Sequence, residues 1–186
     1  MSTKIIVLGD CMVGKTSIIQ KFCFPYKRPR PQKTIGIDCT SRILKFNNTI
    51  YQIQFWDVAG GNEWIGLYPN YIKNSDIAVV VYDVSNQESF LNIKKWIKMI
   101  RDINGSNFPI TVIANKIDKE SARIIHLDTY KTYTKHFNKN IFLIETNTVD
   151  KDGCDHALKC IISQIKPKKV LTMSVSNKSW YEKWFG

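Results

Sequence analysis

Apolar and polar positions follow two patterns along this chain, and the two patterns alternate. Continuous apolar runs rich in β-branched residues are typical of strands buried on both faces of a sheet. Between these runs, apolar residues recur at helical spacing. Alternating strands and helices predict a mostly parallel sheet with helices on both faces. The strand-like runs cover residues 4–10, 77–83, 110–116 and 140–146, and the helical patterns cover residues 14–22, 89–103, 127–138 and 153–166, the last ended by Pro167.

A third pattern occupies the stretch between residues 41 and 57. Residues 41–46 and 50–57 alternate with a period of two on either side of Asn47-Asn48. Asparagine tolerates the left-handed conformation that tight hairpin turns require. The stretch therefore predicts an antiparallel hairpin, which brings the sheet to six strands. In such sheets a ligand binds beyond the carboxyl ends of the strands.

Length and composition narrow the class of protein. A chain of 186 residues fits one substantial domain. Its net charge of +11 accompanies many Lys, Asn and Ile residues, so we attribute it to compositional bias and expect no nucleic-acid binding. A basic surface could still favour anionic lipid or an acidic partner. The five cysteines are scattered and form no CxxC pair, which favours a reducing, cytoplasmic setting. We expect a monomer.

The segment GDCMVGKT (9–16) fits the pattern G-x-x-x-x-G-K-[ST] between a predicted strand and a predicted helix. That context is typical of a phosphate-binding loop, in which backbone N–H groups and the helix N-terminus hold the phosphates. Lys15 would reach the β and γ phosphates and Thr16 would bind Mg²⁺. The alternative is a chance match on an ordinary strand–turn–helix. The predicted phosphate-binding residues are Asp10, Cys11, Met12, Val13, Gly14, Lys15, Thr16 and Ser17.

A second motif, NKID (115–118), follows a strand-like run and indicates which base is bound. The Asp118 carboxylate can accept hydrogen bonds from the ring N–H and the exocyclic amine of guanine, a donor pair that adenine lacks. Asn115 and Lys116 would brace this site. The two motifs together predict a site for GTP or GDP.

With these motifs the chain resembles small GTPases of the Ras superfamily. TIGID (34–38) and WDVAG (56–60) are most similar to the Rab family, whose members act in vesicle trafficking. The match runs without gaps over residues 4–83 and more loosely to residue 166. The resemblance implies a small G domain over residues 1–166. It also implies partners (effectors, exchange factors and GTPase-activating proteins) that bind the first switch segment (25–38) and the second switch segment (60–74).

The resemblance also implies roles for particular residues. Thr34 would close onto Mg²⁺ and the γ phosphate, Asp57 would hold a Mg²⁺-bound water, and the N–H of Gly60 would sense the γ phosphate. The metal-binding residues would thus be Thr16, Thr34 and Asp57, and the positions central to catalysis Lys15, Thr34 and Gly61. ETNTV (145–149) corresponds to the base-contacting loop, so the base contacts would come from Thr146, Asn147 and Thr148.

Position 61 departs from the family pattern, because Gly61 replaces the glutamine that orients the attacking water. Asn62 follows it but is shorter and one residue out of register. We therefore expect slow intrinsic hydrolysis, or hydrolysis that needs groups supplied by a partner. Two alternatives stay open: a binding module of the same fold without turnover, and a small-molecule P-loop kinase. The kinase is disfavoured because NKID would have no purpose there.

The first switch segment departs as well. The family usually places an aromatic residue over the guanine seven positions before Thr34, and this chain has Lys27 there. Tyr26 is one residue away and could substitute. We expect weaker clamping of the base and faster nucleotide exchange.

The last stretch, residues 167–186, is a basic, aromatic tail. The chain has no cysteine after Cys160, so the prenylation typical of the family is not expected. The aromatic residues of the tail would share one face of a short helix, which suggests peripheral membrane contact without prenylation. Docking on the domain, binding a partner and simple disorder are the alternatives. Liposome co-sedimentation with and without residues 170–186 distinguishes membrane contact from the others. These aromatic residues are Trp180, Tyr181, Trp184 and Phe185.

Overall fold

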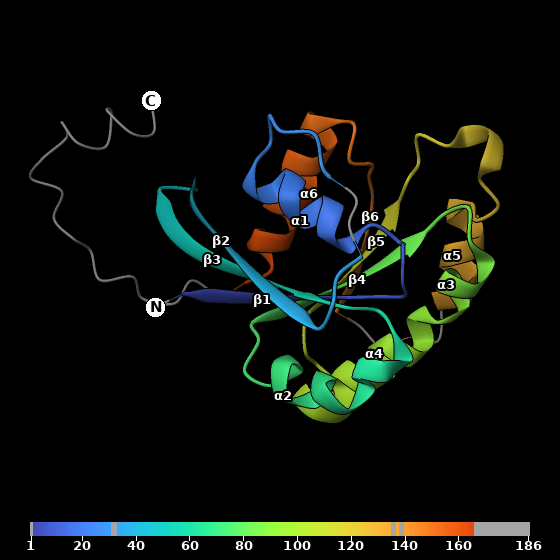
Figure 1. Cartoon of the computed structure of the whole chain (residues 1–186), viewed down its shortest axis with the longest axis horizontal. Coiled ribbons are helices and arrows are strands. Elements are labelled where there is room, and N and C mark those ends of the chain that lie inside the picture. The colour runs from blue at the N-terminus through green and yellow to red at the C-terminus, as the bar shows by residue number, and fades with distance from the viewer. Residues whose placement is uncertain (1, 31–32, 135–136, 138–139, 166–186) are drawn as a thin grey trace, which may run out of the picture.

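The computed structural model of this chain describes residues 2–30, 33–134, 137 and 140–165. Six strands form one sheet in the order β2-β3-β1-β4-β5-β6 (Figure 1). The β2–β3 pair is antiparallel and the other pairs are parallel, so the predicted α/β fold with a six-stranded, mostly parallel sheet is confirmed. The strands are β1 (Thr3–Leu8), β2 (Ile37–Phe46), β3 (Thr49–Val58), β4 (Ile77–Asp83), β5 (Ile110–Asn115) and β6 (Ile141–Glu145).

Helices cover both faces of the sheet, as Figure 1 shows. Successive side chains of a strand point to opposite faces, so Ile5 of β1 packs with α1 and α6 while Ile6 packs with α2, α4 and α5. β4 and β5 are buried along their whole length, which explains their continuous apolar runs. The helices are α1 (Lys15–Cys23), α2 (Tyr68–Ile72), α3 (Gln87–Leu91), α4 (Ile93–Asn104), α5 (Leu127–Thr134) and α6 (Lys151–Ser163), with 3-10 helices η1 (Asn62–Leu67) and η2 (Glu120–Ala122).

The predicted hairpin is present and longer than expected. Asn47 and Asn48 have φ values of 46° and 60°, the left-handed pair that a tight two-residue turn needs. Pairing then runs from Phe46–Thr49 back to Ile37–Val58. β2 therefore starts at Ile37, and this places the TIGID segment beside the end of β3.

The helix predicted over residues 89–103 is two helices, α3 and α4, separated at Asn92. Asn86 caps α3 by accepting a hydrogen bond from the N–H of Ser89 at 3.0 Å. Asn92 has a ψ of −11°, away from the helical value, and its side chain donates to Asp10. A contact to a residue far back in the chain thus interrupts a pattern that locally predicts one helix.

Two other helix boundaries also differ from prediction. α6 begins at Lys151, not at residue 153, because Asp150 caps it by accepting from the N–H of Asp152 at 2.9 Å, and it ends at Ser163 rather than at residue 166. The second switch segment contains η1 and α2. Tyr68 and Ile72 of α2 are fully buried and hold this segment against the core.

In the ranges that the structure describes, no helix is both long and apolar enough to cross a bilayer. The tail over residues 167–186 lies outside the described residues. Its peripheral membrane contact stays a prediction, and so does the cytoplasmic location.

The core on the α4 side supplies a stability prediction. Ile100 of α4 is fully buried, so Ile100→Ala should lower the free energy of unfolding by about 3 kcal/mol through lost burial and a residual cavity. Lys98 on the same helix forms an exposed ion pair with Asp102, and Lys98→Ala should change it by less than about 0.5 kcal/mol. Urea denaturation measures both values. Equal losses in the two variants would contradict this description of the core.

Candidate nucleotide-binding site

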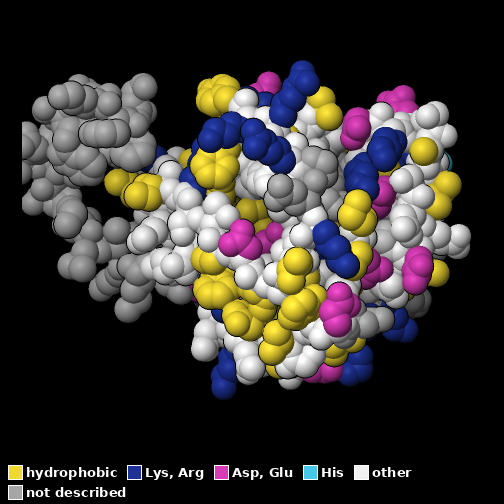
Figure 2. Space-filling model, viewed as in Figure 1, with side chains coloured by type: hydrophobic (Ala, Val, Ile, Leu, Met, Phe, Trp, Pro, Cys, Tyr) yellow, Lys and Arg dark blue, Asp and Glu magenta, His cyan; other side chains and the backbone are white. Residues whose placement is uncertain are grey.

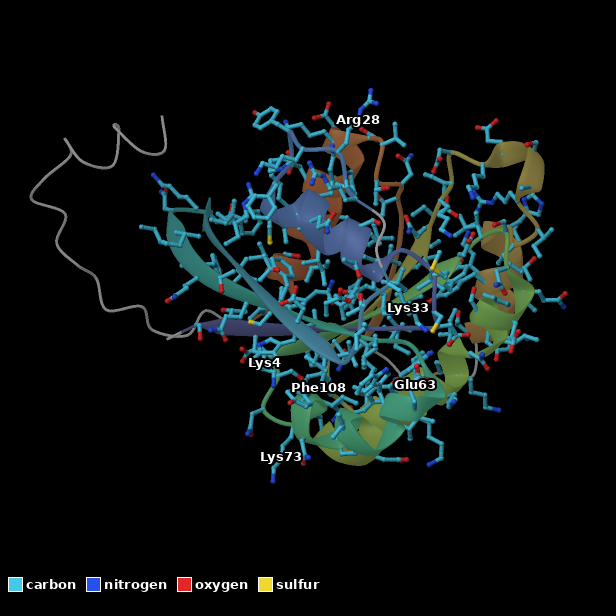
Figure 3. The ribbon with its side chains drawn as sticks, viewed as in Figure 1. Lys4, Arg28, Lys33, Glu63, Lys73 and Phe108 are labelled. Atoms are coloured by element: carbon cyan, nitrogen blue, oxygen red, sulfur yellow. The ribbon has the colours of Figure 1, made fainter. Side chains whose placement is uncertain are left out.

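A cavity of about 260 Å³ opens at the carboxyl end of the sheet, where β1 and β3 end. The phosphate loop, both switch segments and the NKID motif all contribute to its wall. Figure 3 shows Lys33, which lines the cavity beside Thr34. The lining residues are Cys11, Met12, Gly14, Lys15, Thr16, Ser17, Lys33, Thr34, Ala59, Gly60 and Lys116.

The phosphate loop connects the end of β1 to the start of α1. Gly14 has a φ of 98°, and a Cβ added to it would lie 2.3 Å from Nδ2 of Asn115, so this position needs glycine for two reasons. α1 begins directly afterwards with no side-chain cap and no acidic residue in its first turn. The first N–H groups of a helix have no partner within the helix. They are therefore available to an anion at the cavity, and the helix dipole favours one there.

Lys15 provides a buried positive charge at this site. Its side chain is 6% exposed, and its Nζ donates to the main-chain oxygens of Gly9 at 2.8 Å and Asp10 at 2.7 Å. Burial lowers the pKa of Lys15, and the nearby charge of Asp57 opposes this shift. No carboxylate lies within ion-pair distance of it among the described residues. A phosphate in the cavity would supply the missing counter-charge.

The three residues predicted to bind the metal converge. The hydroxyl of Thr16 donates to Oδ2 of Asp57 at 2.5 Å and lies 2.7 Å from the hydroxyl of Thr34. The Thr34 hydroxyl lies 3.2 Å from the same carboxylate oxygen. These residues come from α1, the first switch segment and β3, so a single cluster of oxygens joins three separate parts of the chain.

This cluster has the chemistry that Mg²⁺ prefers, namely hard oxygen ligands with one carboxylate. Asp57 is buried, and its Oδ1 has no hydrogen-bond partner in the part of the chain that the structure describes. Burial raises the pKa of Asp57, while hydrogen bonds from Thr16 and the charge of Lys15 oppose the rise. A bound cation would relieve the cost of the buried carboxylate. The residues present thus fit a magnesium ion.

The NKID motif is attached to the phosphate loop by side-chain hydrogen bonds to its main chain. Asn115 donates from Nδ2 to the main-chain oxygen of Val13 at 2.8 Å, and Lys116 donates to that of Met12 at 2.8 Å. Lys116 also forms an ion pair with Asp83 at 2.7 Å. Oδ1 of Asn115 is buried without a partner among the described residues, an orphaned acceptor of the kind that an absent ligand leaves.

The predicted base loop lies between β6 and α6. The N–H of Thr146 donates to the main-chain oxygen of Ala114 at 2.9 Å, and the buried thiol of Cys154 in α6 donates to the main-chain oxygen of Asn147 at 3.0 Å. Oδ1 of Asn147 accepts from the N–H of Asp150 at 2.7 Å. The loop is therefore fixed to both β5 and α6.

The second switch segment approaches the phosphate loop at Gly60. A Cβ added there would lie 2.4 to 2.5 Å from main-chain atoms of Asp10, Cys11 and Gly9, so a side chain at this position would displace one of the two segments. The next residue, Gly61, is extended with a φ of −83°. The carboxylate of Glu63 lies 2.1 to 2.4 Å from the place that a Cβ of Gly61 would occupy.

The structure places about half of the predicted site residues in the lining of the cavity. Asp118 is exposed and does not line the cavity, and the carboxylate of Asp10 points to α4. Tyr26, proposed as a cover for the base, is 87% exposed and lies under the ammonium of Lys151. Sequence reasoning missed Lys33, although its place directly before Thr34 could have indicated it. The predicted residues outside the cavity lining are Asp10, Val13, Tyr26, Asp57, Gly61, Asn115, Asp118, Thr146, Asn147 and Thr148.

Fold and site together define a nucleotide-binding protein with a phosphate loop at the end of a parallel sheet. A family model described as the Ras family matches residues 4–167, which is most of the chain. The chain therefore belongs to the Ras family, and it is a small GTP-binding switch that binds guanine nucleotides.

In the first switch segment, Lys27 stands at the position where the family usually has an aromatic residue over the base. Lys27 lies over the ring of Phe24, with its Nζ 5.0 Å from the ring centroid. Lys27→Phe should slow the release of a fluorescent GDP about tenfold, because stacking of a base on an aromatic ring contributes about 1–3 kcal/mol. Arg28→Phe, at an exposed neighbouring position, is the matched control and should leave the rate unchanged. Equal slowing in both variants, or none in Lys27→Phe, would contradict the prediction.

Proposed function

We propose that this chain is a Rab-like switch of vesicle trafficking that binds GTP or GDP with Mg²⁺ and hydrolyses GTP slowly or with a partner's help. The observation that carries the proposal is the meeting of Thr16, Thr34 and Asp57 at the mouth of the phosphate loop. The Rab assignment rests on the segments TIGID (34–38) and WDVAG (56–60).

The chain's own groups account for phosphate binding. The first N–H groups of α1 and the ammonium of Lys15 would bind the β and γ phosphates. Thr16, Thr34 and Asp57 would hold Mg²⁺, which when bound neutralises charge on the phosphate oxygens. Asp118, exposed beyond the cavity, would accept hydrogen bonds from guanine. Measuring whether the protein prefers GTP or ATP distinguishes the proposed switch from a small-molecule kinase. Tight binding of ATP without binding of GTP would overturn the proposed switch.

Switching follows from how the two segments are attached. Thr34 belongs to the first switch segment. Its hydroxyl contacts the hydroxyl oxygen of Thr16 and one carboxylate oxygen of Asp57. Gly60 of the second switch segment lies against the phosphate loop. Segments that a γ phosphate holds relax when hydrolysis removes it. Both segments would therefore change together between the GTP and GDP states.

Slow hydrolysis follows from Gly61 and its surroundings. Gly61 has no side chain that could orient a water, and the carboxylate of Glu63 occupies the adjoining space. A carboxylate accepts hydrogen bonds but cannot donate one to the phosphate. Its negative charge would also be repelled by the γ phosphate. The site thus favours binding over turnover.

The surface near the cavity provides places for partners. Figure 2 shows hydrophobic side chains gathered over the start of β2 and over α2 on this face. Ile35 of the first switch segment is 79% exposed, and Ile65 and Leu67 of the second are also exposed. Apolar residues on segments that depend on the nucleotide suit partners that distinguish the two states. The first switch segment also carries three exposed basic residues, Lys27, Arg28 and Arg30. Their positive charge would favour an acidic partner.

Restoring the missing side chain tests the account of hydrolysis. Gly61→Gln should accelerate single-turnover GTP hydrolysis about tenfold to a hundredfold, because positioning of the attacking water is what this site lacks. Glu63 must move aside for the new side chain, so the substitution is also tested together with Glu63→Ala. Gly66→Gln is the control, since a Cβ at Gly66 meets no atom within 4 Å, and it should have no effect.

If Gly61→Gln gives no acceleration, with or without Glu63→Ala, the account of slow hydrolysis is wrong. If wild type and all variants bind GTP tightly without turnover, the binding module is the better description.

A further inference from the structure

A set of contacts joins the phosphate loop to α4 through the side chain of Asp10. Its Oδ2 accepts from Nδ2 of Asn92 at 2.7 Å, and its Oδ1 accepts from Nε1 of Trp96 at 2.8 Å. Asn92 and Trp96 are four residues apart, so they lie on one face of the helix. Each donor therefore binds a different oxygen of one carboxylate.

These two hydrogen bonds hold the negative charge of Asp10 away from the place where phosphates would bind. Asp10 belongs to a loop that binds phosphates, and a free carboxylate there would repel them. Because both of its oxygens are bound on the side of α4, the carboxylate stays outside the cavity lining. The main chain of Asp10 meanwhile accepts the hydrogen bond of Lys15. The side chain and the main chain of Asp10 are thus held in opposite directions.

The contacts continue from α4 to the second switch segment. The rings of Trp96 and Tyr68 lie 5.4 Å apart between centroids, and both side chains are buried. The hydroxyl of Tyr68 lies 2.7 Å from the main-chain oxygens of Ala59 and Gly61, and donates to both. Burial raises the pKa of Tyr68 to about 12, so this donor stays protonated at neutral pH.

Gly60 closes the ring of contacts. It lies between the two residues whose carbonyls Tyr68 binds, and a Cβ added to it would lie 2.4 to 2.5 Å from main-chain atoms of Asp10 and Cys11. The path therefore leads from Asp10 through Trp96 and Tyr68 to the residues flanking Gly60, and back to Asp10. Since each link is a direct contact, the position of Gly60 relative to the phosphate loop depends on all of them.

We propose that Asn92, Trp96 and Tyr68 are positioning residues that hold the N–H of Gly60 and the phosphate loop at the spacing required by the γ phosphate of GTP. This inference rests on the proposed function of Gly60 as the sensor of that phosphate. GDP has no γ phosphate, so these residues should matter for the GTP state and much less for GDP. If these residues had only a structural role, their substitution would lower the affinities for GTP and GDP alike.

The experiment compares the affinity for a non-hydrolysable GTP analogue with the affinity for GDP, both with Mg²⁺. Tyr68→Phe removes the hydroxyl and Trp96→Phe removes the indole donor, while each keeps an aromatic ring. Each should lower the ratio of the two affinities about fivefold, which corresponds to about 1 kcal/mol, the contribution of one hydrogen bond. The affinity for GDP should stay within about twofold of wild type. Lys94→Ala, exposed on α4, is the matched control and should keep the wild-type ratio.

Thermal unfolding of the GDP-bound variants checks that they are folded. If Trp96→Phe does not fold, Asn92→Ala replaces it, because Asn92 is only half-buried and holds the other oxygen of Asp10. A ratio equal to wild type in the folded variants overturns the proposal, and so does an equal loss of affinity for both nucleotides. A wild-type protein that binds neither guanine nucleotide would instead contradict the proposed function.

Discussion

The structure depends most on a lysine ammonium that is buried at the carboxyl end of the sheet without a carboxylate partner among the described residues. Burial of an uncompensated charge is costly, so Lys15 implies an anion that completes its coordination. The surrounding features serve the same anion: α1 starts without a cap, and Gly14 allows Asn115 to approach the loop. In the proposed function, the NKID motif would add a base site beside this phosphate site.

Contacts of the two switch segments with the phosphate loop are the second feature on which the proposed switch depends. Thr34 and Gly60 come from different switch segments, and each meets the phosphate loop through a few polar or close main-chain contacts. The second segment is also fixed from behind by Tyr68, whose ring packs against Trp96. One segment is thus anchored in the core while the other is attached mainly at its tip. In the proposed function, the apolar side chains exposed on both segments would be presented in a manner that depends on the nucleotide.

The sequence predicted the parts of this molecule that local pattern controls. β4 and β5 were recognisable because strands buried on both faces are apolar throughout. The phosphate loop was recognisable because glycine and lysine occur in it at a fixed spacing. The break at Asn92 could not be predicted, because asparagine is compatible with a helix and the partner of its side chain is Asp10, 82 positions earlier. The place of the Tyr26 ring could not be predicted for a similar reason, since it meets Lys151 of α6. Contacts between distant residues decided each of these cases.

The central claim is that this site holds a guanine nucleotide and turns it over slowly. Identification of the nucleotide released from the purified, denatured protein tests it most directly. The account predicts stoichiometric guanine nucleotide with a substantial fraction of GTP, because Gly61 leaves the attacking water without an orienting side chain. Bound ATP, or protein that retains no nucleotide yet is correctly folded, would contradict it.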